Sequence, residues 1–108
     1  MRVLIVDDEP DIVTTTAELL RLVGYDVVTT SDWRQVPDLA MDVDIILHDV
    51  RMPGLDIAQQ VRDLRQRFAG RIVLFTAERI LDPDVAALDV DGLLRKPFGL
   101  DEAEAVLA

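Results

Sequence analysis

The 108-residue chain contains no cysteine, which excludes disulfide bonds and thiolate metal sites. It is also poor in positive charge, because 11 basic residues stand against 21 acidic ones and give a net charge of -10. Direct nucleic-acid binding needs a basic surface, so this balance argues against it. No apolar run has the length of a membrane span, and Asp7 and Asp8 interrupt the first run before it could be a signal-peptide core. We therefore expect a cytoplasmic protein that binds neither nucleic acid nor membranes.

Half of the residues are hydrophobic, and many of them fall in short runs of strand length. Runs of this kind, followed by turn residues, are typical of buried strands in a parallel sheet. Helical periodicity separates the runs, most clearly at Ile57, Val61, Leu64 and Phe68, which recur at i, i+4, i+7 and i+11. Strands are predicted at 3–6, 26–29, 45–49, 72–76 and 92–95, and helices at about 10–23, 33–41, from 57 to a stop at Gly70, 83–88 and 101–107.

Two of the predicted helices carry further expectations. Pro37 lies inside the second helix, which should therefore be short or kinked, with Ser31 or Asp32 as its cap. The third helix should turn its polar face to solvent. That face carries Gln59, Gln60, Arg62, Asp63 and Arg65.

The alternation of five strands with five helices predicts an α/β fold. In such a fold a doubly wound parallel sheet is covered on both faces by helices, and the (βα)5 crossovers are right-handed. At this length the flavodoxin-like strand order 2-1-3-4-5 is the natural one, although the spacing alone leaves the order open. The sequence shows no linker and no internal repeat, so we expect a single domain over residues 1–108.

Polar residues stand at the end of four of the predicted strands or directly after it. Asp7 and Asp8 follow the first strand, Asp49 ends the third, Thr76 ends the fourth and Lys96 follows the fifth. Carboxyl ends of parallel strands share one edge of the sheet, where open α/β sheets bind ligands. Clustered carboxylates raise one another's pKa unless a cation neutralises them, and Mg²⁺ prefers such oxygen ligands. With the ammonium of Lys96 and the hydroxyl of Thr76, the set predicts in-line phosphoryl transfer onto a carboxylate.

Each of these residues also has a plainer interpretation when taken alone. Asp7 and Asp8 could open the first helix, and Asp49 could belong to the Met-Pro-Gly turn that follows it. Thr76 could be an ordinary strand residue and Lys96 a solvated charge. Their joint occurrence at successive strand ends favours the functional interpretation.

His48 is the only histidine and directly precedes Asp49. Neighbouring strand residues point to opposite faces, so His48 should point away from the Asp49 side chain, and we interpret it as a structural or surface residue. Trp33 and Tyr25 are interpreted as packing residues.

Four stretches resemble the receiver domain of two-component response regulators, and the resemblance covers essentially the whole chain. Any one of them alone would be weak, but all four in this order are highly specific. The resemblance also implies the strand order 2-1-3-4-5. The stretches are VLIVDDEP at 3–10, DVRMPG at 49–54, FTA at 75–77 and DGLLRKPF at 91–98.

The resemblance implies a role for each polar residue at the sheet edge. Asp49 matches the phosphoacceptor that takes a phosphoryl group from a histidine kinase or a histidine phosphotransfer protein. Thr76 matches the hydroxyl residue that moves onto the phosphoryl group, and Lys96 the lysine that pairs with it, usually before a cis proline. Such a domain is a switch between two conformations that catalyses its own dephosphorylation, rather than a conventional enzyme.

The resemblance also implies a Mg²⁺ site. Asp8 and Asp49 match direct ligands of the ion, and Asp7 holds it largely through water. The backbone carbonyl of Arg51 matches the group that completes the protein ligands.

The sequence departs from the family pattern in the region that usually signals. Leu93 stands where receivers carry Tyr or Phe, so the usual inward rotation of an aromatic ring cannot operate. Ile57 replaces a common Gly, and Asp89-Val90 replaces a frequent Gly-Ala. The connection from Thr76 to Asp91 looks short, so we expect a reduced or mobile fourth helix. Output could therefore use another surface.

Two alternatives to a phosphorylated switch stay open. One is a receiver-like interaction module that signals without phosphorylation. The other is a Mg²⁺-dependent phosphatase, although the D-x-D strings at 42–44 and 89–91 do not end the first strand. The domain could be cut from a longer chain with a fused output domain, or act alone on a downstream effector protein. It could be a monomer or a phosphorylation-dependent dimer.

Overall fold

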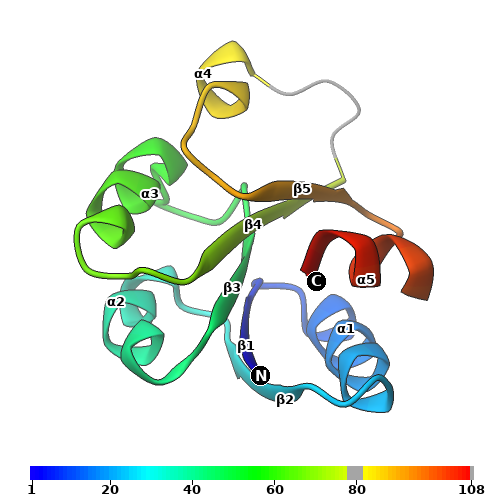
Figure 1. Cartoon of the computed structure of the whole chain (residues 1–108). Coiled ribbons are helices and arrows are strands. Elements are labelled where there is room, and N and C mark those ends of the chain that lie inside the picture. Colours follow the sequence, from blue (N-terminus) through cyan, green and yellow to red (C-terminus); the bar gives the residue numbers. More distant parts are fainter. Residues whose placement is uncertain (78–81, 108) are drawn as a thin grey trace.

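A computed structural model describes residues 1–77 and 82–107. Five strands form one parallel sheet in the order β2-β1-β3-β4-β5 (Figure 1), which confirms the flavodoxin-like order. The strands are β1 (Arg2–Val6), β2 (Asp26–Thr30), β3 (Ile45–Asp49), β4 (Arg71–Thr76) and β5 (Gly92–Arg95). The α-helices are α1 (Pro10–Leu22), α2 (Val36–Leu39), α3 (Ile57–Arg65), α4 (Pro83–Ala86) and α5 (Leu100–Leu107).

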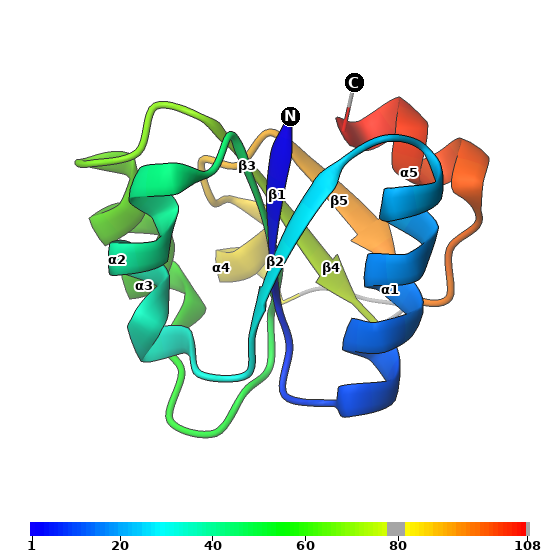
Figure 2. The ribbon, with the colours of Figure 1, turned by 90° about the horizontal axis from the view of Figure 1, so that it is seen from below.

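Helices cover both faces of the sheet, as the alternation predicts. Figure 2 shows α1 and α5 on one face and α2, α3 and α4 on the other, which we call the α2–α4 face. Because alternate residues of a strand point to opposite sides, β1 supplies Val3 and Ile5 to the core under α1 and α5, and Leu4 and Val6 to the core under the α2–α4 face. Within the described ranges, none of the helices is long and apolar enough to cross a membrane.

The second helix is interrupted, as Pro37 predicts. A 3-10 turn (η1, Trp33–Gln35) leads into α2, whose first turn contains Pro37, and a second 3-10 turn (η2, Ala40–Asp42) follows. A side-chain oxygen of Asp32 caps the first turn, because it accepts a hydrogen bond of 3.0 Å from the backbone N–H of Arg34. Proline suits the first turn of a helix, where its missing N–H would have no partner inside the helix.

The predicted solvent face of α3 is wrong at Gln60. Its side chain is only 6% exposed and lies in the stripe formed by the buried residues Ile57, Val61 and Leu64. Gln60 stands three residues after Ile57, and residues at i and i+3 share one face of a helix. Phe68 is buried too, although α3 ends at Arg65.

The prediction is also wrong at Arg65, whose side chain is 23% exposed. Its guanidinium leaves the helix face and donates to the carbonyl oxygens of Gly70 and Asp89, at 3.1 and 2.9 Å, and to Asp91 Oδ2 at 2.7 Å. The long arginine side chain can bury its stem while its head reaches these acceptors. Arg65 thus joins the end of α3 to the segment before β5.

The fourth helix is as short as the sequence indicates. It covers Pro83–Ala86, and Asp82 caps it by accepting from the backbone N–H of Asp84 at 2.8 Å. Residues 78–81 of the predicted connection lie outside the described residues. Leu93 of β5 is half-buried and packs against the core of the α2–α4 face.

Candidate acidic site at the carboxyl edge of the sheet

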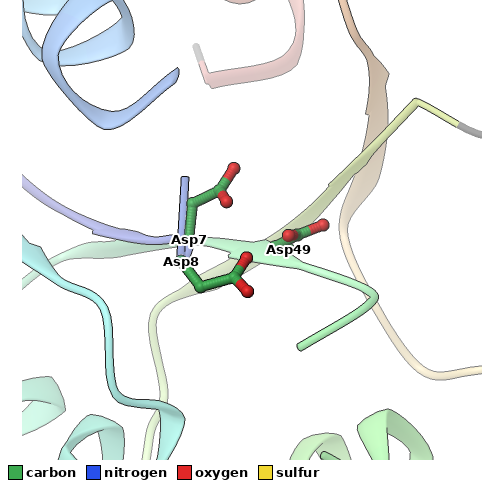
Figure 3. Close-up of side chains that lie close together, drawn as sticks. All are labelled: Asp7, Asp8 and Asp49. Carbon is green, nitrogen blue, oxygen red and sulfur yellow. The ribbon is translucent and has the colours of Figure 1, made fainter. Parts of the chain in front are cut away.

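Three carboxylates gather where the central strands end. Asp49 is the last residue of β3, and β3 lies between β1 and β4. Asp7 and Asp8 directly follow β1, whose Val6 is in register with His48. The three side chains converge (Figure 3), and one oxygen from each lies within 4.8 Å of the others. Parallel pairing brings these sequence-distant residues together because all strands share one direction.

The burial of the three carboxylates differs. Asp7 is 0% exposed and Asp49 is 6% exposed, whereas Asp8 is exposed to solvent. Asp7 Oδ1 accepts a hydrogen bond from the backbone N–H of Glu9 at 3.0 Å, which turns the chain from β1 into α1. The carboxylates of Asp7 and Asp49 are therefore buried, and that of Asp8 faces solvent.

Lys96 is the cation inside this cluster. Its Nζ lies 2.6 Å from Asp7 Oδ2 and 3.5 Å from Asp49 Oδ1, and it sits 4.3 Å from the centre of the Phe75 ring. The backbone N–H of Lys96 donates to the carbonyl of Thr76 at 2.8 Å, which ties the end of β5 to that of β4. The Lys96–Pro97 peptide bond is cis, as the resemblance implies.

Asp49 is oriented by its own loop. The backbone N–H groups of Val50 and Arg51 donate to Asp49 Oδ1 at 2.8 and 3.4 Å. Burial and then the charge of Asp7 raise the pKa of Asp49 to about 6, against the opposing effects of Lys96 and the two N–H groups. One ammonium does not offset three carboxylates, and this all-oxygen donor set fits a hard divalent cation.

The remaining predicted site residues lie at the same edge. Thr76 ends β4 and is 2% exposed, and Arg51 is an exposed residue of the loop after β3. The structure therefore places all the predicted site residues at one edge of the sheet, while their chemical roles stay predictions. They are Asp7, Asp8, Asp49, Arg51, Thr76 and Lys96.

Sequence reasoning gave His48 a structural or surface role but missed its buried polar contacts behind the acceptor. His48 is fully buried, and its Nδ1 lies 2.7 Å from the carbonyl oxygen of Asp49. Burial lowers the pKa of His48 to about 4, so the ring is neutral near pH 7. Its other nitrogen faces Gln60 of α3. The i+3 spacing of Gln60 from Ile57 is the sequence signal that could have revealed this contact.

Comparisons with known proteins agree with this arrangement. The family model described as the response regulator receiver domain matches residues 3–108. The chain is 35% identical to the transcriptional regulatory protein TcrA of Mycobacterium tuberculosis, covering 99% of this chain and 44% of TcrA. It is 32% identical to the transcriptional regulatory protein CpxR of Escherichia coli, covering 90% of this chain and 43% of CpxR. The chain thus spans less than half the length of these relatives.

Solved structures of similar chains have the same fold. The chemotaxis protein CheY4 of Vibrio cholerae is 29% identical, with a TM-score of 0.85 over 98% of this chain and 94% of that one. The response regulator TrrA of Thermotoga maritima, in complex with Mg²⁺–BeF, is 28% identical, with a TM-score of 0.81 over 96% of this chain and 93% of that one. The family match over nearly the whole length, together with this sheet order, shows that the chain belongs to the response regulator receiver domain family.

Proposed function

We propose that this receiver domain accepts a phosphoryl group on Asp49 and that it requires Mg²⁺ to do so. The donor is a phosphohistidine of a histidine kinase or of a histidine phosphotransfer protein. One observation carries the proposal: Lys96 lies between Asp7 and Asp49, at 2.6 and 3.5 Å, beside a third carboxylate. Such a site binds a cation and tolerates an incoming phosphoryl group once its charge is balanced.

The family resemblance implies which groups would hold the metal. Asp8 and Asp49 would bind Mg²⁺ directly, Asp7 would hold it largely through water, and the backbone carbonyl of Arg51 would complete the protein ligands. When bound, Mg²⁺ neutralises the carboxylates and the phosphoryl oxygens. The TrrA complex with Mg²⁺–BeF supports the proposed need for Mg²⁺, because that protein has the same fold.

Asp49 is the nucleophile of the proposed reaction. Its Oδ1 is held by the N–H groups of Val50 and Arg51, so we assign the attack to Oδ2. The new bond joins Oδ2 to phosphorus, and the phosphorus–nitrogen bond to the donor histidine breaks. The imidazole nitrogen leaves with the electron pair and takes a proton from solvent. The product is an aspartyl phosphate.

Lys96 and Thr76 stabilise the transferred group. The ammonium of Lys96 is already 3.5 Å from Asp49 Oδ1 and pairs with a phosphoryl oxygen after transfer. Thr76, at the end of β4, donates its hydroxyl to another phosphoryl oxygen. The phosphoryl group is later removed by hydrolysis, in which water attacks phosphorus, the bond to Asp49 breaks, and orthophosphate leaves. The domain is therefore a self-dephosphorylating switch rather than a conventional enzyme.

The relatives support a proposal for the biological setting. TcrA and CpxR are transcriptional regulatory proteins, and this chain covers the part that corresponds to a receiver. We infer a cytoplasmic receiver that spans residues 1–108 as one domain, binds no nucleic acid or membrane itself, and works as a monomer or a phosphorylation-dependent dimer. It controls a fused output domain or a separate effector protein.

Intact mass after incubation with acetyl phosphate tests the proposal. We expect one added phosphoryl group that requires Mg²⁺, disappears with chelator and is lost in Asp49→Ala. Asp63→Asn is the matched control, because Asp63 is an exposed aspartate on α3 outside the cluster. If folded wild-type protein with Mg²⁺ gains no mass from acetyl phosphate or from a histidine kinase, the proposal is wrong.

One observation favours a second candidate function. Leu93 is an aliphatic residue in β5, and α4 covers only Pro83–Ala86. A receiver that signals through protein contacts without phosphorylation is consistent with these features. In that case the wild-type protein and the Asp49→Ala variant would bind the partner with the same affinity.

A further inference from the structure

A chain of hydrogen bonds runs behind the acceptor, on the α2–α4 face. It begins at His48, whose Nδ1 lies 2.7 Å from the carbonyl oxygen of Asp49. A carbonyl oxygen can only accept, so Nδ1 carries the proton and Nε2 is left as an acceptor in the neutral ring. The ring is fully buried, so these two contacts decide its orientation.

Gln60 of α3 continues the chain. Its Nε2 donates to the backbone carbonyl of Trp33 at 2.8 Å and lies 3.4 Å from His48 Nε2. The amide nitrogen has two hydrogens, and here it meets two acceptors. A buried amide is costly unless it is hydrogen-bonded, so these contacts account for the presence of Gln60 among apolar neighbours.

Trp33 closes the chain back onto the acceptor loop. Its indole Nε1 donates to the carbonyl oxygen of Pro53 at 3.0 Å, and Pro53 lies four residues after Asp49. The hydrogen bonds therefore hold two backbone carbonyls, those of Asp49 and Pro53. Between them lie Val50 and Arg51, whose N–H groups orient Asp49 Oδ1.

We propose that His48, Gln60 and Trp33 are positioning residues that hold the loop from Asp49 to Pro53 in the geometry needed for Mg²⁺ binding and phosphorylation. The inference rests on the proposed function and extends it to three residues outside the acidic cluster. They act through the backbone of the loop. Apolar residues of similar shape could fill the same space at little cost in stability, so packing alone does not explain this polar chain.

Two variants test the proposal by removing hydrogen bonds: Gln60→Met nearly keeps the side-chain volume, whereas Trp33→Phe leaves a smaller ring. Gln60→Met removes the amide that links His48 to Trp33, and Trp33→Phe removes the donor to Pro53. Ile46→Val is the control, because Ile46 is buried in β3 in the core on the same face and its side chain has no polar group. The measurements are the initial rate of phosphorylation by acetyl phosphate, the Mg²⁺ dissociation constant by calorimetry, and unfolding by urea.

We expect Gln60→Met and Trp33→Phe each to slow phosphorylation and weaken Mg²⁺ binding by about three- to tenfold, the effect of losing one or two buried hydrogen bonds. The double variant should lose less than the product of the two single effects, because both act on one chain of contacts. Ile46→Val should lose stability while keeping the wild-type rate and Mg²⁺ affinity. If the phosphorylation rate falls in proportion to the unfolding free energy in all variants, the chain of hydrogen bonds has only a structural role and the proposal is wrong.

The same experiment separates this inference from the proposed function. If the wild-type protein is phosphorylated, and Gln60→Met and Trp33→Phe both keep the wild-type rate and Mg²⁺ affinity, only the positioning inference is overturned. A wild-type protein that is not phosphorylated refutes the proposed function and the inference with it. Trp33→Phe decides the matter if Gln60→Met does not fold.

Discussion

The ammonium of Lys96 lies closer to Asp7 than to the acceptor: Nζ is 2.6 Å from Asp7 Oδ2 and 3.5 Å from Asp49 Oδ1. Asp7 is 0% exposed, so Lys96 supplies the charge partner that a fully buried carboxylate needs. In the metal-free protein the positive charge of Lys96 thus offsets the charge of Asp7 more strongly than that of Asp49, because its contact with Asp49 is longer.

Replacement of Lys96 by methionine should destabilise the metal-free protein. Methionine keeps most of the apolar stem but leaves the buried Asp7 carboxylate without its cation, which costs about 3 kcal/mol of unfolding free energy. Mg²⁺ should restore part of this loss, because it supplies positive charge to the same carboxylates. Urea unfolding with Mg²⁺ and with chelator measures both effects. Equal stability of variant and wild type in chelator would contradict the importance of the Lys96–Asp7 pair.

Mg²⁺ affinity should fall as the pH falls through 6. The pKa of Asp49 is raised to about 6 in the metal-free protein, first by burial and then by the charge of Asp7, so protons compete with the metal below that pH. Between pH 7.5 and pH 5 the dissociation constant should rise about tenfold, as one protonation with this pKa requires. Calorimetric titration should also detect proton release on binding near pH 6. An affinity that does not change over this range would show that Asp49 is not a ligand.

Asp49→Asn should stabilise the metal-free protein near neutral pH. A raised pKa means that the folded state holds this proton more tightly than the unfolded chain, whose ordinary value is 3.8. The contribution of Asp49 to stability is therefore fully present below 3.8 and is lost as the pH rises through about 6. At pH 7 the amide avoids this loss, and we expect a gain of about 2 kcal/mol.

The gain from Asp49→Asn should disappear near pH 4 and shrink when Mg²⁺ is present. Urea unfolding in the presence of chelator, at pH 7 and at pH 4, measures whether Asp49→Asn raises or lowers the unfolding free energy. Val50→Ile is a useful control variant, because it changes a neighbouring apolar residue without altering charge. If Asp49→Asn is less stable than wild type at pH 7, the ionised Asp49 carboxylate does not lower the unfolding free energy of the metal-free protein.

Arg65→Met should loosen the segment before β5. Arg65 donates to Gly70, Asp89 and Asp91, and the N–H of Ile72 shares Asp91 Oδ2 at 2.8 Å. Loss of the guanidinium should cost about 1–2 kcal/mol and raise amide hydrogen exchange in β5.

The matched control for Arg65→Met is Arg62→Met. Arg62 is exposed on the same helix and contacts Gln59 at 3.0 Å, so its replacement should change stability by less than about 0.5 kcal/mol. Equal effects of the two substitutions would show that the Arg65 contacts contribute nothing to the stability of this region.

The sequence by itself determined the elements and the location of the site. The short apolar runs that end at Val6, Asp49 and Thr76 are typical of buried strands, and strands joined by helical crossovers lie parallel. Parallel strands present their carboxyl ends at one edge, so the polar residues at those ends were predicted to share that edge, and the strand order brings them together. The position of Pro37 likewise predicted the interruption of the second helix, because this effect is local to the chain.

The tertiary structure decided which polar groups are paired and which are buried. Gln60 and Arg65 have polar side chains on a helix, and only the packing of α3 against β3 and the segment before β5 determines that one contacts His48 and the other Asp91. The preference of Lys96 for Asp7 and the raised pKa of Asp49 depend in the same way on distances between residues far apart in sequence. Electrostatic and hydrogen-bond energies fall steeply with distance, and residue order does not give distances of a few ångström between separate elements.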